Sequence, residues 1–369
     1  MPTVLIAGTG SHLVVGSAIA DALEAESRDP NIHFVACRPD TDPPLLRQEG
    51  RAFDLFPMIA PPRAPSLRLL RAANLGMRAC AATRRLIRSL RPDVLFATGA
   101  YGSGPPALAA WLARVPIILF EPEIEPTLAT RLLAPFSRAI ACAHTCTLTR
   151  VSLHRARLTG MPLRKAFLTV SRPEARASLG LSASTPYLFC TGGSQGARSL
   201  NQTLWDALPA LFARIAALRI CHTTGAAGYA QGLTHWSSLP PNQRERYRMV
   251  ERLDSSEMAR VYAAADVAVT RTGANTIAEL DALNVPALLI PYPFAAGGHQ
   301  HKNAEALVQS GQALLLEDSG LSPDTLLQHV RALLREPGAD RPTRQDGARE
   351  AAKRVANLIL ETAAEACRS

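Results

Sequence analysis

The chain has 369 residues, of which 47% are hydrophobic and 19% charged, a composition typical of a globular protein with a sizeable core. This length favours two domains over one. The net charge of +9 suits a partner such as nucleic acid, an anionic membrane surface or a phosphorylated small molecule.

The cysteines and the hydropathy of the chain indicate its cellular compartment and its relation to membranes. Seven cysteines without a framework of paired spacings indicate a reducing cytoplasm. The start of the chain lacks the basic and apolar regions of a signal peptide, and no stretch approaches the ~18–20 apolar residues of a membrane span. We therefore expect a protein that is soluble or that rests on a membrane without crossing it.

The first half of the chain alternates short apolar runs with stretches of helical spacing. Alternation of this kind predicts parallel strands joined by crossover helices. The predicted strands cover residues 3–7, 33–37, 93–97, 115–120 and 139–143, and the predicted helices 14–26, 67–90 and 107–114.

This rhythm breaks near Thr159–Pro162 and then resumes, which predicts an α/β fold of two doubly wound parallel-sheet domains with a cleft between them. Asp254 is a good N-cap for one of the later helices. Strands are predicted at 187–190, 218–223, 249–253, 267–270 and 287–290, and helices at 199–214, 255–264, 276–283, 302–310, 323–336 and 344–366.

The segment Gly8-Thr9-Gly10-Ser11-His12 follows the first predicted strand. It does not match the dinucleotide pattern G-x-G-x-x-G, because residue 13 is leucine. Its glycines still let the backbone approach a ligand, and His12 could act as a general base or hydrogen-bond donor. The alternative is a histidine that caps backbone groups at the helix start.

A second glycine-rich segment, Cys190–Asn201, leads from a predicted strand into a helix. The N–H groups and dipole of such a helix attract anions, so Gly192, Gly193, Ser194 and Gly196 could surround a phosphate. No Gly-Lys-Ser/Thr follows, so this is not a Walker sequence. A tight turn without a ligand is the alternative.

A third segment, Arg271–Glu279, also opens a helix after a predicted strand. Gly273 to Thr276 offer backbone donors and a hydroxyl to a second phosphate group. Glu279 shares a helical face with Thr276, and its carboxylate could accept from the vicinal hydroxyls of a ribose. The alternative for Glu279 is a capping-box partner of Thr276.

Metal binding is weakly supported by the sequence. His299 and His301 lie in a polar segment that suits hydroxyl recognition, but no nearby carboxylate completes a ligand set. Cys142, His144 and Cys146 likewise lack a second ligand pair. We therefore expect no metal site.

Five segments, in order and spacing, resemble the MurG family of glycosyltransferases over nearly the whole chain. They are Gly99–Pro105, Thr159–Arg164, Gly192–Asn201, Thr272–Glu279 and His299–Asn303. The resemblance implies transfer of N-acetylglucosamine from UDP-N-acetylglucosamine to lipid I, which forms lipid II for peptidoglycan, with inversion and without a metal or other cofactor. It also implies a GT-B fold. Residues 1–160, completed by a C-terminal helix at about 344–369, would hold the acceptor, and residues 161–343 the UDP-sugar.

The resemblance also implies roles for single residues. His12 would be the catalytic base that deprotonates the acceptor hydroxyl. The implied donor contacts are the diphosphate at Gly193, Ser194 and Gln195 with Arg164 nearby, phosphate at Ala274, Asn275 and Thr276, the ribose at Glu279, the sugar at His299 and Gln300 supported by Asn303, and the uracil near the backbone of Leu253. The implied acceptor-side residues are Gly10, Ser11, Tyr101 and Glu123.

The acceptor half departs from the family pattern in two places. The first loop reads Ala7-Gly-Thr-Gly-Ser11-His12, where family members usually have Gly-Gly-Thr-Gly-Gly-His. Glu121-Pro-Glu123 replaces a usual Glu-Gln-Asn, so a carboxylate stands in place of an asparagine. Two alternatives stay open: a different lipid or small hydrophobic acceptor, and a non-catalytic nucleotide-sugar-binding protein on the same fold.

The positive charge is concentrated between Arg63 and Arg91, where eight arginines and no acidic residue occur among apolar side chains. A basic amphipathic helix is typical of a membrane-surface element. The resemblance implies a lipid acceptor on the cytoplasmic leaflet, so we expect peripheral binding at the cytoplasmic face of the bacterial inner membrane. An ordinary crossover helix with a solvated basic face is the alternative. No nucleic-acid-binding module accompanies the charge, so we expect no nucleic-acid partner. The expected membrane contacts are Arg68, Arg71, Arg84, Arg85 and Arg88.

Overall fold

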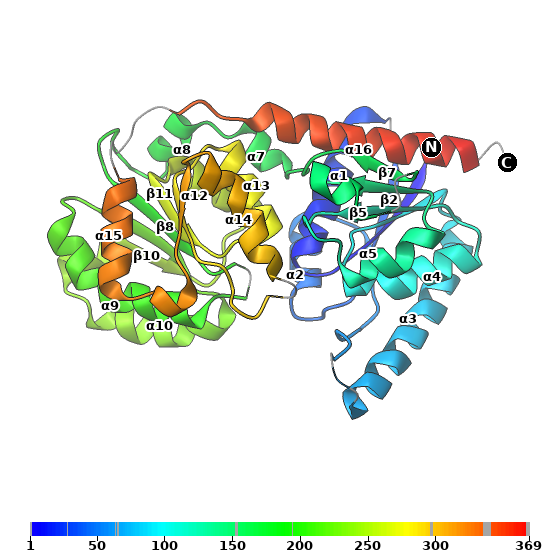
Figure 1. Cartoon of the computed structure of the whole chain (residues 1–369), viewed down its shortest axis with the longest axis horizontal. Coiled ribbons are helices and arrows are strands. Elements are labelled where there is room, and N and C mark those ends of the chain that lie inside the picture. The colour runs from blue at the N-terminus through cyan, green and yellow to red at the C-terminus, as the bar shows by residue number, and fades with distance from the viewer. Residues whose placement is uncertain are drawn as a thin grey trace. The chain divides into compact units, whose positions relative to one another are not determined.

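The computed structural model describes residues 2–27, 29–62, 64, 66–151, 154–193, 195–295, 298–334 and 341–366. The chain forms two compact units, each with its own parallel sheet (Figure 1). Unit 1 comprises Met1–Arg164 and Gly347–Ser369, and unit 2 comprises Lys165–Asp346. None of the helices within the described ranges is long and apolar enough to cross a membrane.

Unit 1 contains a seven-stranded sheet in the order β3-β2-β1-β4-β5-β6-β7, and its neighbouring strands pair in parallel. The strands are β1 (Thr3–Ala7), β2 (Asn31–Ala36), β3 (Phe53–Leu55), β4 (Val94–Ala97), β5 (Ile117–Glu121), β6 (Ala139–Cys142) and β7 (Ala156–Leu158). The helices are α1 (Ser11–Glu26), α2 (Asp42–Gln48), α3 (Leu67–Leu90), η1 (Tyr101–Ser103), α4 (Gly104–Leu112), α5 (Leu128–Leu133), η2 (Ala134–Phe136), α6 (Thr145–Leu148) and α16 (Gln345–Ala366).

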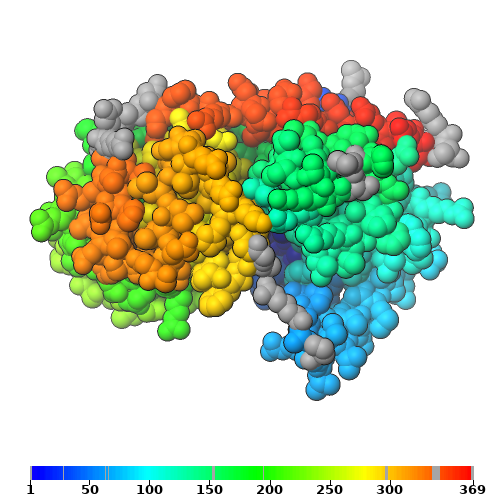
Figure 2. All heavy atoms as spheres, viewed as in Figure 1, coloured from blue at the N-terminus to red at the C-terminus, as the bar shows by residue number. Residues whose placement is uncertain are grey.

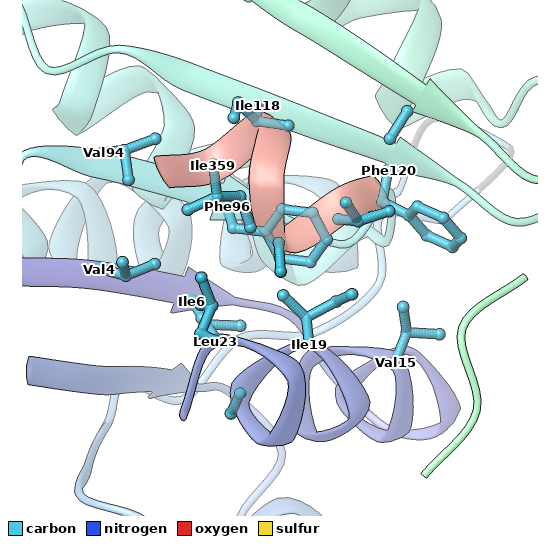
Figure 3. Close-up of a cluster of buried hydrophobic side chains, with 14 of the residues drawn as sticks. Val4, Ile6, Val15, Ile19, Leu23, Val94, Phe96, Ile118, Phe120 and Ile359 are labelled. Carbon is cyan, nitrogen blue, oxygen red and sulfur yellow. The ribbon is translucent and has the colours of Figure 1, made fainter. Parts of the chain in front are cut away.

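The core on one face of this sheet joins the two ends of the chain. On α1, Val15, Ile19 and Leu23 recur every fourth residue, so they lie on one helical face and are buried. They pack in one cluster with strand residues and with Ile359 of α16 (Figure 3). The strand residues labelled there are Val4, Ile6, Val94, Phe96, Ile118 and Phe120. The last helix therefore belongs to the core of the first sheet.

Unit 2 contains a six-stranded parallel sheet in the order β10-β9-β8-β11-β12-β13. The strands are β8 (Tyr187–Thr191), β9 (Arg219–Thr223), β10 (Tyr247–Val250), β11 (Val267–Thr270), β12 (Ala287–Leu289) and β13 (Ala313–Leu315). The helices are α7 (Lys165–Thr169), α8 (Arg172–Ser178), α9 (Arg198–Arg214), α10 (Ala226–Ser238), α11 (Pro241–Arg244), α12 (Ser255–Ala264), α13 (Ala274–Ala282), α14 (His299–Gln309), η4 (Asp318–Gly320) and α15 (Pro323–Leu333).

The predicted α/β architecture with parallel sheets is confirmed, but several helices begin earlier than predicted. α1, α13 and α14 begin at Ser11, Ala274 and His299, against predicted starts at residues 14, 276 and 302. The apolar period appears only where a helix packs on its sheet. The first turns of these three helices carry polar residues, so the period does not reveal them.

Candidate active site

Two helices of unit 2 begin beside each other at the carboxyl edge of its sheet. β8 pairs with β11 on one side and with β9, the next strand along the chain, on its other side. The carboxyl ends of β8 and β11 therefore form a topological switch point of the sheet. α9 follows β8, and α13 follows β11. Ligands of open α/β sheets bind at such points. We call this region the donor edge, because the sequence predicts contacts with a UDP-sugar donor there.

The loop between β8 and α9 requires glycine for steric reasons. A Cβ on Gly192 would lie 2.3 Å from the backbone nitrogen of Ala197, and one on Gly196 would lie 2.1 Å from the carbonyl oxygen of Thr224. Gly193 has a φ of +78° with nothing near its Cβ position, so the loop is open there. The predicted diphosphate contact Ser194 lies outside the described residues, and its neighbour Gln195 is exposed.

A buried polar network lies next to this loop and fixes the carbonyl of Thr224 against which Gly196 packs. Asn201 donates to the carbonyl of Thr224 at 2.9 Å, and its side-chain oxygen lies 3.0 Å from Nε2 of His222. Nε2 therefore carries the ring proton, and Nδ1 accepts from the hydroxyl of Tyr247 at 2.7 Å. Trp205 donates to the same hydroxyl oxygen at 3.0 Å. Burial lowers the pKa of His222 to about 3, so the network stays neutral.

Arg271 holds the two sides of the donor edge together. Its guanidinium is buried, pairs with Asp318 at 2.7 Å and donates to Ser199 in the first turn of α9 at 2.8 Å. It also donates to the carbonyls of Ile290 and Pro291, just after β12, both at 3.2 Å. Arg271 lies in a glycine-rich segment, but the sequence pattern predicted no role for it, because its partners lie in loops that are far away along the chain.

The predicted phosphate residues Ala274, Asn275 and Thr276 form the first turn of α13. The N-cap is Gly273 and makes no side-chain capping bond, so the capping-box alternative for Thr276 and Glu279 is wrong. Thr276 lies inside the helix, and Glu279 follows one turn later with its side chain buried. The first turn and this carboxylate therefore share one helix at the donor edge.

The start of α14 braces the same region. The amide oxygen of Gln300 accepts from the backbone N–H of Tyr292 at 2.8 Å and from the hydroxyl of Thr272 at 3.2 Å. Asn303 is buried and donates to the carbonyl of Thr272 at 3.2 Å. Because the oxygen of Gln300 is already bonded, its amide hydrogens are the groups suited to a sugar hydroxyl. His299 begins this helix.

Two further predicted donor residues lie elsewhere. Leu253 is half-buried between β10 and α12, next to Asp254, which forms a capping box with Glu257. Arg164 ends the first of the two segments that make up unit 1. Burial raises the pKa of the Glu49 carboxyl, and the positive charge of Arg164 opposes this rise. His301 pairs with a carboxylate of Glu317 at 2.9 Å. Across the described residues no group of three or more His, Cys, Asp or Glu side chains could hold a metal ion.

In unit 1, His12 lies in the first turn of α1 at the carboxyl ends of β1 and β4, which are neighbours. Its Nδ1 lies 2.8 Å from the carbonyl oxygen of Thr98 and therefore carries the ring proton. Nε2 is then the nitrogen that can accept a proton. Tyr101 begins the short helix η1 in the loop after Thr98, and Ser11 precedes His12 with an exposed side chain.

A buried carboxylate shapes the loop that carries Glu123. Glu121 is fully buried, and it accepts from the backbone N–H groups of Glu123 at 2.9 Å and Thr127 at 2.8 Å. Burial raises the pKa of Glu121 to about 7. Thr127 in turn donates to the carbonyl of Gly99 at 2.9 Å, so this loop is tied to the one that contains Tyr101. The sequence pattern predicted no role for Glu121 itself. The signal that could have revealed this buried carboxyl is an acidic residue at the end of an otherwise apolar strand.

The five predicted membrane-contact arginines are exposed on α3. Its first turns project from the surface of unit 1 (Figure 2). Leu67 and Leu70, in these turns, are 85% and 68% exposed. Further along, α3 passes over α4 with Gly76 close to Pro105, 3.6 Å from its Cβ position. A groove of about 590 Å³ follows, and its lining includes Met77, Arg84, Arg85, Arg88, Leu108 and Leu112. The helix thus presents apolar and basic groups together.

Two family models of known proteins match the two halves of this chain. The glycosyltransferase family 28 N-terminal domain matches residues 3–142, and the corresponding C-terminal domain matches residues 187–359. UDP-N-acetylglucosamine–N-acetylmuramyl-(pentapeptide) pyrophosphoryl-undecaprenol N-acetylglucosamine transferase of Halothermothrix orenii is 33% identical, with 96% of this chain and 97% of the relative covered. The chain belongs to the MurG family of glycosyltransferases. The Paenarthrobacter aurescens protein of the same name is 36% identical, with 96% and 94% covered.

Solved structures show the GT-B fold of this MurG family member. MurG of Acinetobacter baumannii superposes with a TM-score of 0.64 at 22% identity, covering 98% of this chain and 100% of that one. A UDP-GlcNAc 2-epimerase from Neisseria meningitidis, bound to UDP-GlcNAc, reaches 0.69 at 11% identity with 98% and 100% covered. Proteins of different activity thus share the fold, and membership of the MurG family rests on the sequence relatives.

Proposed function

We propose that this protein transfers N-acetylglucosamine from UDP-N-acetylglucosamine to lipid I, the undecaprenyl-pyrophosphoryl N-acetylmuramyl pentapeptide, and so forms lipid II for peptidoglycan. The observation that carries the proposal is the full-length similarity to transferases of that name, at 33% and 36% identity. Both glycosyltransferase domains match in the expected order. The donor edge supplies helix starts and a buried carboxylate of the kind that a UDP-sugar needs.

The donor is held mainly by residues of unit 2. The open side of the loop at Gly193, with Ser194 and Gln195, and the first turn of α13 at Ala274, Asn275 and Thr276 bind the diphosphate through backbone N–H groups. Glu279 binds the ribose, Leu253 meets the uracil, and Arg164 adds positive charge. Gln300 and His299 read sugar hydroxyls while Asn303 keeps the turn at Thr272 in place. Arg271, which precedes α13, fixes the first turn of α9 and the end of β12 through its hydrogen bonds.

The transfer is a direct displacement with inversion at the anomeric carbon. Nε2 of His12 removes the proton from the acceptor hydroxyl, whose oxygen forms the new bond as the bond to UDP breaks. The helix dipoles at the donor edge stabilise the negative charge that develops on the leaving diphosphate. No metal ion is needed for this role. Gly10, Ser11, Tyr101 and Glu123 contact the acceptor.

The acceptor carries a long hydrocarbon chain, so the protein works at a membrane surface. The exposed leucines at the start of α3 enter the lipid interface, and Arg68, Arg71, Arg84, Arg85 and Arg88 bind anionic headgroups. The enzyme is then peripheral, on the cytoplasmic face of the inner membrane.

The test is transfer by the purified full-length protein in detergent micelles, with radiolabelled UDP-N-acetylglucosamine and lipid I. We expect labelled lipid II and one equivalent of UDP. The His12→Ala variant should lose roughly 10²- to 10⁴-fold in kcat, the usual contribution of a general base. Glu279→Ala should mainly raise KM for the donor. UDP binding without transfer to lipid I, or transfer only to another lipid or small hydrophobic acceptor, would contradict the proposal.

A further inference from the structure

A buried carboxylate joins the first two loops of unit 1. Asp42, the first residue of α2, is fully buried. Its Oδ1 accepts from the backbone N–H of Gly10 at 2.9 Å. Its Oδ2 accepts from the hydroxyl of Thr9 at 3.1 Å and from the N–H groups of Cys37 at 3.0 Å and Arg38 at 2.8 Å. One side chain therefore fixes the loop after β1 against the loop after β2.

Three backbone N–H groups at the start of α1, those of Gly10, His12 and Leu13, also donate within the chain. A helix start attracts anions because its first N–H groups lack helical partners. Here Gly10 donates to Asp42, while the N–H groups of His12 and Leu13 bond to the carbonyls of Thr9 and Gly10, both at 3.1 Å. A phosphate group at this point would meet bonded donors and the negative charge of a buried carboxylate.

We propose that Asp42 is a positioning residue for His12, and that the start of α1 receives a sugar hydroxyl of the acceptor and not its diphosphate. The inference rests on the proposed function for the identity of the acceptor. Gly10 has a φ of +56°, and its bond to Asp42 holds this left-handed turn, from which α1 begins. The bond from Nδ1 to Thr98 then fixes the ring. The imidazole is thus held through its backbone and through its side chain.

Kinetics of substituted enzymes test the positioning role. Asp42→Asn keeps the size of the side chain but replaces one accepting oxygen by an N–H₂ group, so the turn at Gly10 loosens. We expect kcat to fall on the order of 10²-fold, as for a misplaced catalytic group, with KM for UDP-N-acetylglucosamine unchanged because the donor edge lies in unit 2. Added to His12→Ala, the substitution should cost little more.

The control is Asp93→Asn. Asp93 also binds a backbone N–H, that of Thr3 at 2.7 Å, but at the opposite end of β1. This variant should lose stability while it keeps kcat. Equal losses of kcat in the Asp42 and Asp93 variants, or full additivity with His12→Ala, would overturn the positioning role.

A second measurement needs no turnover, so it separates this inference from the proposed function. In the ¹⁵N-labelled full-length protein, titration with inorganic diphosphate should leave the Gly10 amide resonance as steady as that of the exposed Gly50. Histidine ¹⁵N shifts should report the Nδ1–H tautomer of His12 in the wild type and a mixture in Asp42→Asn. A diphosphate-dependent shift of Gly10, or identical His12 tautomers in both proteins, would refute the inference even if lipid II is formed.

Discussion

At the scale of single residues, Glu121 makes the stability of unit 1 depend on pH. Its pKa is raised by burial to about 7 from an ordinary 4.5, so the folded state holds a proton that the unfolded state has released. The contribution of Glu121 to stability is therefore greatest at acidic pH and declines as pH rises through 7. We expect the unfolding free energy of the wild type, relative to Glu121→Gln, to fall by no more than about 3 kcal/mol between pH 5 and 8.

Urea unfolding of both proteins across this pH range measures the difference. Glu361→Gln, at an exposed position of α16, is the matched control and should follow the wild type at every pH. A difference between wild type and Glu121→Gln that is constant with pH would show that the carboxyl does not change its ionisation there.

The loop between β8 and α9 allows a sharper test, because two of its glycines share a positive φ but differ in the space around their Cβ positions. Gly193 and Gly196 both have positive φ, +78° and +75°, but only Gly196 has a close neighbour at its Cβ position. Gly193→Ala should cost about 1–2 kcal/mol of unfolding free energy from backbone strain alone. Gly196→Ala adds a clash with the carbonyl of Thr224 and should cost roughly 1–3 kcal/mol more. Equal costs in denaturant titrations would contradict the packing described here.

Which residues could be predicted from the sequence depends on how local their partners are. His12, Thr276 and Glu279 stand in short segments at strand ends, so pattern alone named them. Asp42 and His222 were not named. Asp42 bonds to Thr9, 33 residues away, and His222 to Asn201, 21 residues away, and only the packed sheets bring these pairs together.

At the scale of elements, the same distinction separates what periodicity could predict. α3 was predicted with both ends correct, because its apolar and basic residues follow one helical period throughout. The short edge strands β3, β7 and β13 were not predicted, since three residues are too few to show an alternation. The sequence predicted α16 as a helix, and its buried residues show that it packs on the first sheet.

This packing of α16 can be measured. Ile359 is fully buried in the core that contains β1 and α1, so Ile359→Ala should remove about 2–5 kcal/mol from the unfolding free energy of unit 1. Glu361→Ala, two residues along on the exposed face, should change it by less than about 0.5 kcal/mol. Thermal unfolding followed by circular dichroism compares the two. Similar midpoints for both variants would mean that α16 contributes little to the core.

At the scale of the whole molecule, one segment accounts for most of the net charge. The chain carries +9, and the eight arginines between Arg63 and Arg91 have no acidic residue among them, so the remainder is nearly neutral. A charge spread over the surface would favour non-specific binding to any polyanion. A charge concentrated on one amphipathic helix and its flanking residues, beside exposed leucines, instead favours a lipid surface with anionic headgroups.

Binding to vesicles that contain phosphatidylglycerol tests this distribution. Replacing Arg84, Arg85 and Arg88 with glutamine should weaken binding at low salt by about 1 kcal/mol per residue, on the order of 10²-fold in total, because each arginine near the surface contributes about that much. Leu67→Ser with Leu70→Ser should weaken it at all salt concentrations, since that part is hydrophobic. The matched control replaces three exposed arginines of unit 2, Arg214, Arg219 and Arg331. An equal loss in this control would mean that net charge, and not α3, drives the association.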